Sequence, residues 1–475
     1  MSPLVRRALA LAAVAALTVV AVVVLFPGEP SVRRLVPGSG ADNDPLAYTP
    51  ARESAFAAAA ARGHAHVIYA KSPGGARASA ARTARYRPLV EAAAAAADVD
   101  PDTLEAIVLL ESAGRPDVTA DPRLEGAVGL TQILAETGRN LLGMKVDPAA
   151  ARRIGRSLRR ASRAGDGALI ARLRARRRQV DERFDPPRAL AAAARYLTIA
   201  RQALHRDDLA VVSYHMGIGN LQAALRAYGD EDVSYARLYF DSTPLDHGEA
   251  YRRLAALGDD SATYLWRVEA AREIMRLYRT DPAQLDRISA LQTAKNSAEE
   301  VLHPQDETES FATPSDLRAA YDDQRIVALR PATLAKYDLA IDPGMGELAP
   351  RLGAGRATYR GLRPTALALL AYIGAGAKAI AAGGPLVVTS SVRDARYQRL
   401  LRAGNSEATP NYSLHTTGWA FDILRRYRSR AQALAFEFML ERLQSYDLIA
   451  WVREPAAIHV TVSADARRLA AVLTP

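Results

Sequence analysis

Three residues near the C-terminal end of the chain have the side chains that zinc sites use. His415 and Asp422 lie close together in "SLHTTGWAFDI", and His459 stands in the strand-like "AIHVTV". Two imidazoles and one carboxylate, with an open position for water, form a chemically sound catalytic zinc site. The chain contains no cysteine, so any metal must be held by His, Asp and Glu. The alternative is a pair of buried histidines whose ring nitrogens bond to backbone carbonyls.

A second candidate for chemistry is the carboxyl group of Glu111. Leu104, Ile107, Val108 and Glu111 fall at the spacing of one helical face, so Glu111 belongs to a face that should be buried. Burial disfavours the ionised form, and the raised pKa would let Glu111 act as a general acid. The alternative is a carboxylate that reaches solvent at a helix end or pairs with an arginine.

The elements around Glu111 are predicted to be helices. Residues 86–278 contain repeated helix starts, in which Asp100, Asp185, and Asp207 or Asp208 precede apolar runs. An arginine-rich insert at about 149–180 is interpreted as a solvated helix pair rather than a dedicated anion site. This part of the chain is therefore expected to be a mainly α domain.

The elements around the histidines are of a different kind. A predicted helix, Pro364–Ala381, is followed by the β-like run "PLVVTSS" and later by "AIHVTVS". That mixture predicts a smaller α+β domain. At 475 residues the chain is too long for one ordinary core, which agrees with two or three domains.

The N-terminal residues predict a membrane anchor. Arg6 and Arg7 precede an apolar run over residues 8–26, nearly as long as the ~20 residues that span a bilayer. No small-residue cleavage site follows it, so a retained anchor is favoured over a removed signal. The arginine pair places the N-terminus in the cytoplasm, although Arg33 and Arg34 weaken the contrast. The remainder is expected in the periplasm, with the chain held in the inner membrane.

The boundaries expected from these patterns divide the chain into five parts. They are an anchor (1–27), an Ala/Pro/Arg-rich tether (28–85), a first catalytic domain (86–280), a linker (281–328) and a second catalytic domain (329–475). The net charge of +10 suits a polyanionic neighbour. Given export, cell wall or lipid headgroups are favoured over nucleic acid, and no interleaved basic and aromatic pattern argues for base stacking.

Three motifs in order add a family resemblance to the Glu111 region. "ESAGRPDV", "GAVGLTQI" and "SYHMGIGN" begin at Glu111, Gly126 and Ser213. They resemble the Glu-Ser, Gly-Leu-Met-Gln and Ala-Tyr-Asn-x-Gly motifs of lytic transglycosylases in the goose-type lysozyme superfamily. The resemblance implies that Glu111 protonates the bond between N-acetylmuramic acid and N-acetylglucosamine, and that the muramoyl 6-hydroxyl then closes a 1,6-anhydro ring. One protein carboxyl group suffices when the substrate supplies the nucleophile.

The same resemblance implies roles for neighbouring residues. Ser112 would orient the glutamate or the sugar, Gln132 would line the groove and Tyr214 would contact Glu111. The sequence departs from the family where Thr131 replaces the usual Met and His215 replaces the usual Asn. His215 is interpreted as either a groove residue or a helix-surface histidine, with the second favoured.

A second resemblance covers residues 385–462. "SLHTTGWAFD" resembles the Ser-x-His-x-x-Gly-x-Ala-x-Asp motif of zinc D-Ala-D-Ala carboxypeptidases and dipeptidases, and "TSSVRDARYQ" resembles their preceding arginine segment. It implies that His415, Asp422 and His459 bind zinc and that Arg393 holds a substrate carboxylate or carbonyl, a task for which its planar fork is suited.

One departure concerns the catalytic glutamate of that family, which usually stands three residues before the last histidine. Here "REPAAIH" places Glu454 five residues before His459. Pro455 predicts a turn that could return the carboxylate to the metal-bound water as a general base. Glu454 could equally be a loop residue.

The leading hypothesis is therefore a membrane-anchored peptidoglycan hydrolase. It would combine an N-terminal transmembrane helix, a mainly α lysozyme-like domain without a cofactor, and a C-terminal α+β zinc peptidase-like domain that cleaves stem peptides. One alternative makes the C-terminal domain a non-catalytic peptidoglycan-binding or scaffold module. Another makes the whole chain a scaffold. The sequence leaves open which peptide bond is cut, whether glycan strands are cut at ends or within, and which proteins are partners.

Overall fold

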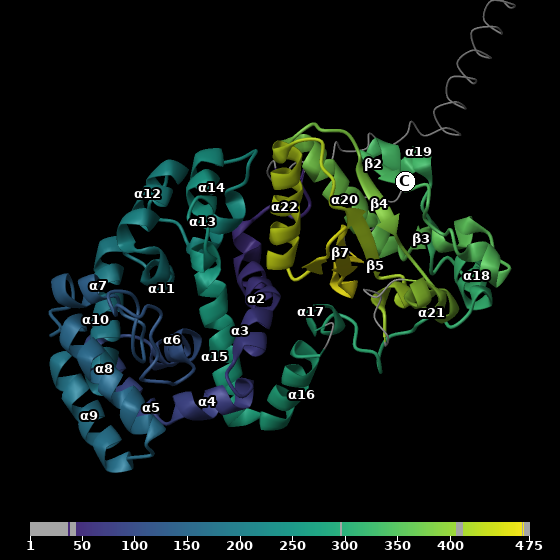
Figure 1. Ribbon diagram of the computed structural model, residues 1–475. Coiled ribbons are helices and arrows are strands. Elements are labelled where there is room, and N and C mark those ends of the chain that lie inside the picture. Colours follow the sequence, from purple (N-terminus) through teal and green to yellow (C-terminus); the bar gives the residue numbers. More distant parts are fainter. Residues whose placement is uncertain (1–36, 39–43, 295–296, 405–411, 468, 470–475) are drawn as a thin grey trace, which may run out of the picture.

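The computed structural model describes residues 37–38, 44–294, 297–404, 412–467 and 469 (Figure 1). The anchor predicted over residues 8–26 lies outside these ranges. Within them, no helix combines the length and apolar character needed to cross a membrane. The described chain forms a mainly helical N-terminal region followed by a mixed α/β region, and the two lie side by side in Figure 1.

The N-terminal region is built from helices, and the predicted capping residues differ in what they do. Asp100 accepts hydrogen bonds from the backbone amides of Asp102 and Thr103. Asp185 precedes the next predicted helix without a side-chain capping bond, and Asp207 and Asp208 lie inside a helix that begins after Arg206. The α-helices of this region are α2 (Glu53–Gly63), α3 (His66–Lys71), α4 (Ala76–Ala84), α5 (Arg87–Ala97), α6 (Pro101–Ser112), α7 (Ala135–Asn140), α8 (Pro148–Arg163), α9 (Gly167–Val180), α10 (Pro186–Leu204), α11 (Asp207–Met216), α12 (Ile218–Tyr228), α13 (Tyr235–Asp241), α14 (Gly248–Ala255), α15 (Tyr264–Thr280) and α16 (Pro282–Gln292).

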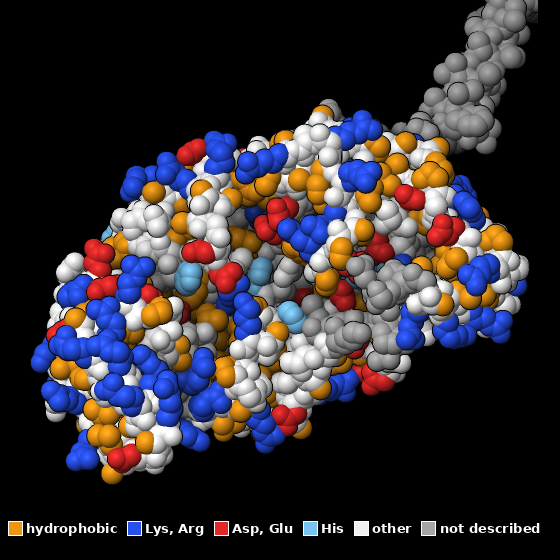
Figure 2. Space-filling model, viewed as in Figure 1, with side chains coloured by type: hydrophobic (Ala, Val, Ile, Leu, Met, Phe, Trp, Pro, Cys, Tyr) orange, Lys and Arg blue, Asp and Glu red, His pale blue; other side chains and the backbone are white. Residues whose placement is uncertain are grey.

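The arginine-rich insert is the predicted helix pair. Helices α8 and α9 pack on each other and leave most of their arginines exposed. Figure 2 shows Lys and Arg side chains gathered over the part of the molecule that holds this pair. Arg177 is the exception, because it is buried beside Asp117 and lies over the ring of Phe184.

The expected tether is corrected from residue 44 onward. The helix predicted near Glu53 is present as α2, but α3 and α4 follow it, and all three pack against α15. The physical reason is that the tether contains buried apolar side chains, including Phe56, Ile68 and Tyr69, which need a partner surface. The sequence did not reveal these apolar residues as a packing surface, because the stretch is rich in alanine and arginine.

The expected linker, residues 281–328, is also partly helical. Asp281 caps α16 by accepting from the amide of Gln284, and Pro282 occupies the first turn. Thr313 and Asp316 form a capping box at the start of α18 (Pro314–Asp322). These start signals are the same ones that identified the upstream helices, so the correction follows from the local sequence.

The C-terminal region contains a five-stranded sheet in the order β2-β4-β5-β7-β6, in which only β2 and β4 are parallel. Helices α20 and α22 pack on each other and against β7 and β6, respectively. The strands are β1 (Val327–Ala328), β2 (Leu339–Ile341), β3 (Gly361–Leu362), β4 (Leu386–Ser390), β5 (Ala420–Leu424), β6 (Ile449–Arg453) and β7 (Ala457–Val462). The remaining helices are α17 (Ser297–Glu300), α19 (Pro331–Lys336), α20 (Pro364–Ile380), α21 (Ala395–Gly404) and α22 (Arg430–Ser445).

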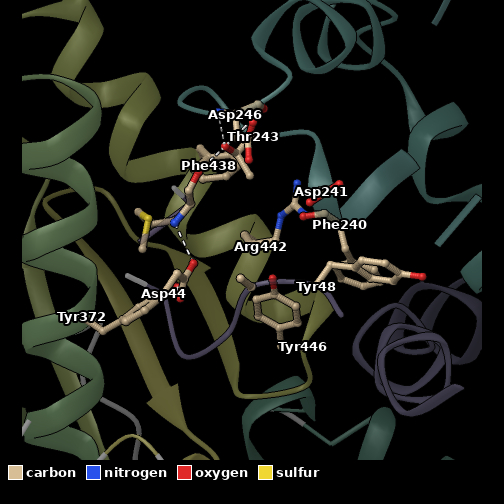
Figure 3. A pocket seen from close by; sticks show the side chains of 13 residues that line it. Asp44, Tyr48, Phe240, Asp241, Thr243, Asp246, Tyr372, Phe438, Arg442 and Tyr446 are labelled. Atoms are coloured by element: carbon tan, nitrogen blue, oxygen red, sulfur yellow. Dashed lines mark hydrogen bonds between the residues drawn. The ribbon is translucent and has the colours of Figure 1, made fainter. Parts of the chain in front are cut away.

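A buried arginine joins the two regions. Arg442 on α22 donates to the backbone carbonyl oxygens of Tyr239, Phe240 and Ser242, each at 2.9 Å. Figure 3 shows Arg442 close to Phe240. The residues before α2 join the same interface, since Asp44 accepts a hydrogen bond from the hydroxyl of Tyr372 on α20 at 2.9 Å. One continuous apolar cluster therefore extends through both regions.

Candidate functional site

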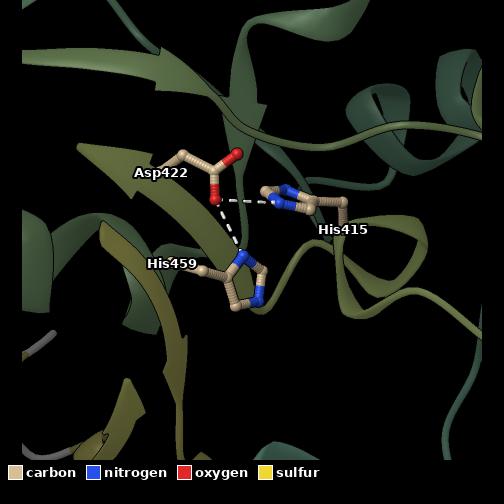
Figure 4. Close-up of side chains that lie close together, drawn as sticks. All are labelled: His415, Asp422 and His459. Atoms are coloured by element: carbon tan, nitrogen blue, oxygen red, sulfur yellow. Dashed lines mark hydrogen bonds and ion pairs between the residues drawn. The ribbon is translucent and has the colours of Figure 1, made fainter. Parts of the chain in front are cut away.

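The two predicted histidines and the aspartate converge in the C-terminal region. His415 lies in a short 3-10 helix, Leu414–Thr417, just before β5, which carries Asp422. His459 lies on β7, directly opposite Asp422 in the antiparallel pairing of β5 with β7 (Figure 4). All three side chains are largely buried, and one ligand atom from each lies within 4.8 Å of the others.

The ring nitrogens of this group are oriented for metal binding. His415 Nδ1 lies 2.9 Å from the carbonyl oxygen of Ser391, so Nδ1 carries the ring proton. The lone pair on Nε2 is then the one that can bind a metal ion. Asp422 Oδ1 lies 3.1 Å from that Nε2 and 2.7 Å from His459 Nδ1. Two imidazole nitrogens and one carboxylate oxygen fit the ligand set of a zinc site with an open position. This buried group could hold a metal ion such as zinc.

The pKa shifts of His415 and Asp422 favour the protonation states that bind a metal, whereas the pKa of His459 is shifted toward the protonated ring. Burial, assisted by the Arg393 guanidinium, lowers the pKa of His415 to about 4, so its ring is neutral near pH 7. Burial acts to raise the pKa of Asp422, but the two histidines bring it well below its usual value. For His459, burial acts to lower the pKa, yet Asp422, Glu299 and Glu454 together raise it.

A glycine fixes the turn between His415 and β5. Gly418 has a φ of +76°, and a Cβ atom there would lie 2.5 Å from Ile326 Cδ1. Other residues rarely adopt that conformation, and this one would also clash. The glycine of the motif therefore has a backbone role, and it lets the chain turn from the histidine into the strand that carries Asp422.

Arg393 lies beside the candidate metal centre. Its guanidinium contacts Ser390 Oγ at 2.5 Å, Gln398 Oε1 at 3.0 Å and Asp422 Oδ2 at 3.5 Å. Its backbone amide donates to the carbonyl oxygen of His415. Arg393 is thus held next to Asp422 by several contacts.

Glu454 lies in the turn that joins β6 and β7. Its backbone amide donates to the carbonyl oxygen of Ala457 and closes the hairpin. Its carboxylate lies close enough to the site to act on the pKa values of His459 and Arg393. The expected turn at Pro455 is therefore present, and it directs the chain back toward the candidate centre.

Sequence reasoning missed Glu299, which lies at the same centre. Its carboxyl group is buried, and Oε1 lies 3.7 Å from His459 Nε2. The residue belongs to the acidic, polar stretch that was interpreted as a linker. No spacing or periodicity in that stretch distinguishes Glu299 from the neighbouring Glu300, so only the three-dimensional arrangement identifies it.

The second candidate site is the carboxyl group of Glu111, near the C-terminal end of α6. It lines a cavity of about 190 Å³ together with α3 residues that include Lys71 and with Asp260 and Arg267. Burial raises the pKa of Glu111 to about 7, even though a hydrogen bond from Tyr264 acts in the opposite direction. A glutamate of this kind carries a proton near neutral pH and can donate it.

The tyrosine that contacts Glu111 differs from the expected one. Tyr264, the first residue of α15, donates its hydroxyl to Glu111 Oε1 at 2.7 Å. Tyr214 instead donates to the carbonyl oxygen of Thr131 at 2.8 Å and stacks on the Tyr264 ring. Tyr264 lies outside the three motifs, in a helix that arrives from a distant part of the sequence, so the motifs could not reveal it.

The other residues predicted at this site form hydrogen bonds with backbone atoms and not with Glu111. Ser112 Oγ donates to the carbonyl oxygen of Val108, and Gln132 Nε2 donates to that of Gly129 at 2.8 Å. Among the residues that line the Glu111 cavity, Ser112 is present and Gln132 is not. His215 is exposed on α11, bonds to Ser261 Oγ and stacks on the Tyr264 ring at 5.2 Å.

A buried arginine shapes the loop of the second motif. Arg183 donates to the carbonyl oxygens of Leu124, Gly126 and Ile133 and forms a fully buried ion pair with Asp181. Gly129 packs against the Arg183 backbone with a φ of +81°. Sequence reasoning did not single out Arg183, because one arginine in a chain rich in arginine carries no distinguishing signal.

The Glu111 cavity adjoins a larger one. Asp260 and Arg267 also line a cavity of about 540 Å³ between the two regions, whose wall on the other side includes Glu437 and Trp451. Figure 2 shows the surface hollowed between the regions. Asp260 and Arg267 therefore border both cavities.

No protein-family model matches the chain, and no curated protein shows significant similarity to it.

Proposed function

We propose that the chain is a bacterial peptidoglycan hydrolase that cleaves glycan strands at Glu111 and stem peptides at a zinc centre. The observation that carries the proposal is Glu111 itself, a carboxyl group with a pKa of about 7 at the wall of a cavity, held by one tyrosine. The ordered motifs around it support a lysozyme-like fold for the N-terminal region and lytic transglycosylase activity.

In this mechanism Glu111 acts first as the acid and then as the base. The protonated carboxyl group gives its proton to the glycosidic oxygen, and the bond from that oxygen to C1 of N-acetylmuramic acid breaks. The carboxylate then accepts the proton of the muramoyl 6-hydroxyl as its oxygen bonds to C1. Tyr264 holds Oε1 in place throughout, which leaves the other oxygen to exchange the proton.

Hydrolysis is the competing reaction, because Asp260 lines the same cavity as Glu111. An ion pair with Arg267 lowers the pKa of Asp260, which is therefore an ionised carboxylate of the kind that can activate water. Because the Asp260 carboxylate is engaged by Arg267, the transglycosylase reaction is favoured over hydrolysis. The two reactions differ in product, since hydrolysis leaves a reducing sugar and no anhydro ring.

For the C-terminal region we propose a zinc peptidase of the D-Ala-D-Ala carboxypeptidase type. The chemistry that a bound zinc ion supplies is polarisation of the peptide carbonyl and activation of a water molecule. His415, Asp422 and His459 would hold the ion. Arg393 would donate to the substrate from its position beside Asp422, and the carboxylate of Glu454 would accept the proton of the attacking water.

The predicted location and partners complete the proposal. The anchor over residues 8–26 would hold the chain in the inner membrane with both regions in the periplasm, next to peptidoglycan. The net charge of +10 and the exposed arginines of α8 and α9 support association with a polyanionic wall. Nucleic acid is not proposed as a partner.

The glycan activity is tested by digesting purified sacculi with the protein and weighing the released muropeptides by mass spectrometry. We expect 1,6-anhydro products from the wild type and none from Glu111→Gln. Glu125→Gln is the matched control, because Glu125 is exposed and pairs with Arg139 outside the Glu111 cavity. If the products instead have reducing ends and disappear in Asp260→Asn, the N-terminal region is a glycan hydrolase and not a transglycosylase.

The peptidase activity is read in the same spectra. We expect shortened or cleaved stems that disappear with a chelator, return with zinc and are lost in Glu454→Ala. Their masses identify the bond that is cut. Intact stems together with measurable zinc binding would favour the alternative, in which the C-terminal region is a non-catalytic module that binds peptidoglycan.

A further inference from the structure

We propose that Glu299 is the residue that orients His459 for metal binding, so that the segment entering from the N-terminal region completes the candidate metal centre. This inference rests on the proposed zinc site. It adds a positioning residue from outside the motifs that define that site.

The geometry of His459 calls for a partner on its far nitrogen. Nδ1 faces Asp422 and His415, so a metal ion held by the three residues would bind Nδ1. The ring proton must then lie on Nε2. Histidines that bind metals almost always donate this second N–H to a carboxylate, a carbonyl oxygen or water, which fixes the ring and makes it a better ligand.

Two acceptors lie near Nε2. Glu299 Oε1 is 3.7 Å away and Thr461 Oγ1 is 3.4 Å away. The first distance exceeds a hydrogen bond, but a carboxylate attracts an N–H more strongly than a hydroxyl does. Metal on Nδ1 draws electrons from the ring and strengthens the N–H as a donor. We therefore infer that Glu299 closes on Nε2 when the site is loaded.

The position of Glu299 is built into the fold. The chain that follows it is anchored across the end of the sheet, where His303 bonds to the carbonyl oxygen of Val462 at 2.6 Å and stacks on Trp419 at 4.7 Å. Farther along, the amide of Phe311 donates to the carbonyl oxygen of Thr416 at 2.7 Å. Glu299 is buried against the centre by these contacts.

The segment also connects the two regions. Helix α17, which carries Glu299, contacts α16 and β6, while α16 packs against α3, α4 and α15 of the N-terminal region. The metal centre thus takes its ligands from the C-terminal region and its orienting carboxylate from the connection between the regions.

The test measures zinc affinity of the full chain by competition with a chromogenic chelator. We expect Glu299→Ala to weaken zinc binding by about 10- to 100-fold and Glu299→Gln, which keeps the shape and an acceptor oxygen, by less. The matched control is Glu300→Gln, which changes the neighbouring carboxyl group and should bind zinc like the wild type. Melting temperatures of the metal-free proteins and anhydro-product formation should not change.

Three outcomes would overturn the inference. Equal zinc affinity of Glu299→Ala and the wild type would contradict the role of Glu299 but not the proposed metal site. Unchanged affinity in Glu299→Ala with a loss in Thr461→Val would assign the role to Thr461. No zinc binding by the wild type, or wild-type binding in His415→Ala, would remove the metal site and this inference with it. If Glu299→Ala does not fold, Glu299→Gln against Glu300→Gln decides the question.

Discussion

The pKa values of two buried carboxyl groups, those of Glu111 and Asp422, are shifted in opposite directions by their surroundings. Glu111 has few polar partners, so burial dominates and its pKa rises to about 7. Asp422 is buried as well, but two histidines adjoin it and its pKa falls well below the usual value. The first can release a proton at neutral pH, and the second is ionised there and suits a cation.

The pH dependence of glycan cleavage should report the pKa of Glu111. Because the reaction needs the protonated acid, we expect the rate to fall as the pH rises through about 7. The hydroxyl of Tyr264 stabilises the ionised form, so Tyr264→Phe should raise the pKa and move this fall to higher pH. The measurement is initial rate against pH on soluble glycan strands.

Tyr214→Phe is the control for that experiment. Tyr214 stacks on Tyr264 but donates to the carbonyl oxygen of Thr131 rather than to Glu111. Its removal should leave the pH of the fall in place. A profile that shifts in Tyr214→Phe and not in Tyr264→Phe would contradict the assignment of the hydrogen bond to Glu111.

At the scale of elements, the loop between α6 and α7 depends on a close contact of two backbones. A Cβ atom on Gly129 would lie 1.9 Å from the carbonyl oxygen of Arg183, and the φ of +81° already disfavours other residues. The loop and the buried Arg183–Asp181 pair must therefore shift together if Gly129 gains a side chain.

Gly129→Ala should lower both stability and glycan cleavage. We expect a loss of several kcal/mol, on the order of 3–5, from the clash and the disturbed ion pair. Gly165→Ala is the control, since Gly165 also has a positive φ, +69°, but nothing lies within 4 Å of its Cβ position. It should cost only about 1–2 kcal/mol. Thermal unfolding of both variants tests this prediction. Similar melting temperatures for Gly129→Ala and Gly165→Ala would contradict it.

The elements also show which parts of the fold and sites could be predicted. The helix predicted over Pro364–Ala381 is confirmed as α20, and the strands expected around "LVVTS" and "AIHVTV" are β4 and β7. Each is a local pattern of apolar spacing with a start signal. The convergence of His415, Asp422 and His459 was also predictable, because a motif and a strand carry all three.

What could not be predicted depends on contacts between distant segments. Tyr264 reaches Glu111 because α15 packs along α6, and Glu299 reaches His459 through a segment that local composition marked as linker. The α3 residues at the Glu111 cavity were assigned to a tether for the same reason. Such partners have ordinary residue types and no spacing rule, so one sequence alone cannot reveal them.

At the scale of the whole molecule, Arg442 should determine how firmly the two regions are joined. Its guanidinium satisfies three backbone carbonyl oxygens and lies over the rings of Tyr239, Phe240 and Phe438. Arg442→Met fills similar space but leaves those oxygens without a donor, a cost on the order of 3 kcal/mol. We expect a lower melting temperature, with unfolding split into two steps.

Arg453→Met provides the comparison, because Arg453 is exposed and forms an ion pair with Glu437. An exposed ion pair of this kind contributes about 0–1 kcal/mol, so the melting temperature should stay near that of the wild type. A single unchanged transition in Arg442→Met, measured by calorimetry, would show that the regions do not depend on this contact.

The place of α2 has a consequence for the order in which the chain can fold. Phe56 on α2 stacks on the ring of Phe240 at 5.1 Å and meets the ring of Tyr446 at a tilt, at 5.2 Å, so α2 is covered in part by the end of α22. During synthesis, the ribosome releases α2 long before α22 exists, and domains otherwise tend to fold in the order they emerge. Until residue 446 has been made, the part of the Phe56 ring that faces Tyr446 stays uncovered and can contact wrong partners. A nascent chain that stops before α22 should therefore be a better client for chaperones and proteases than the finished protein.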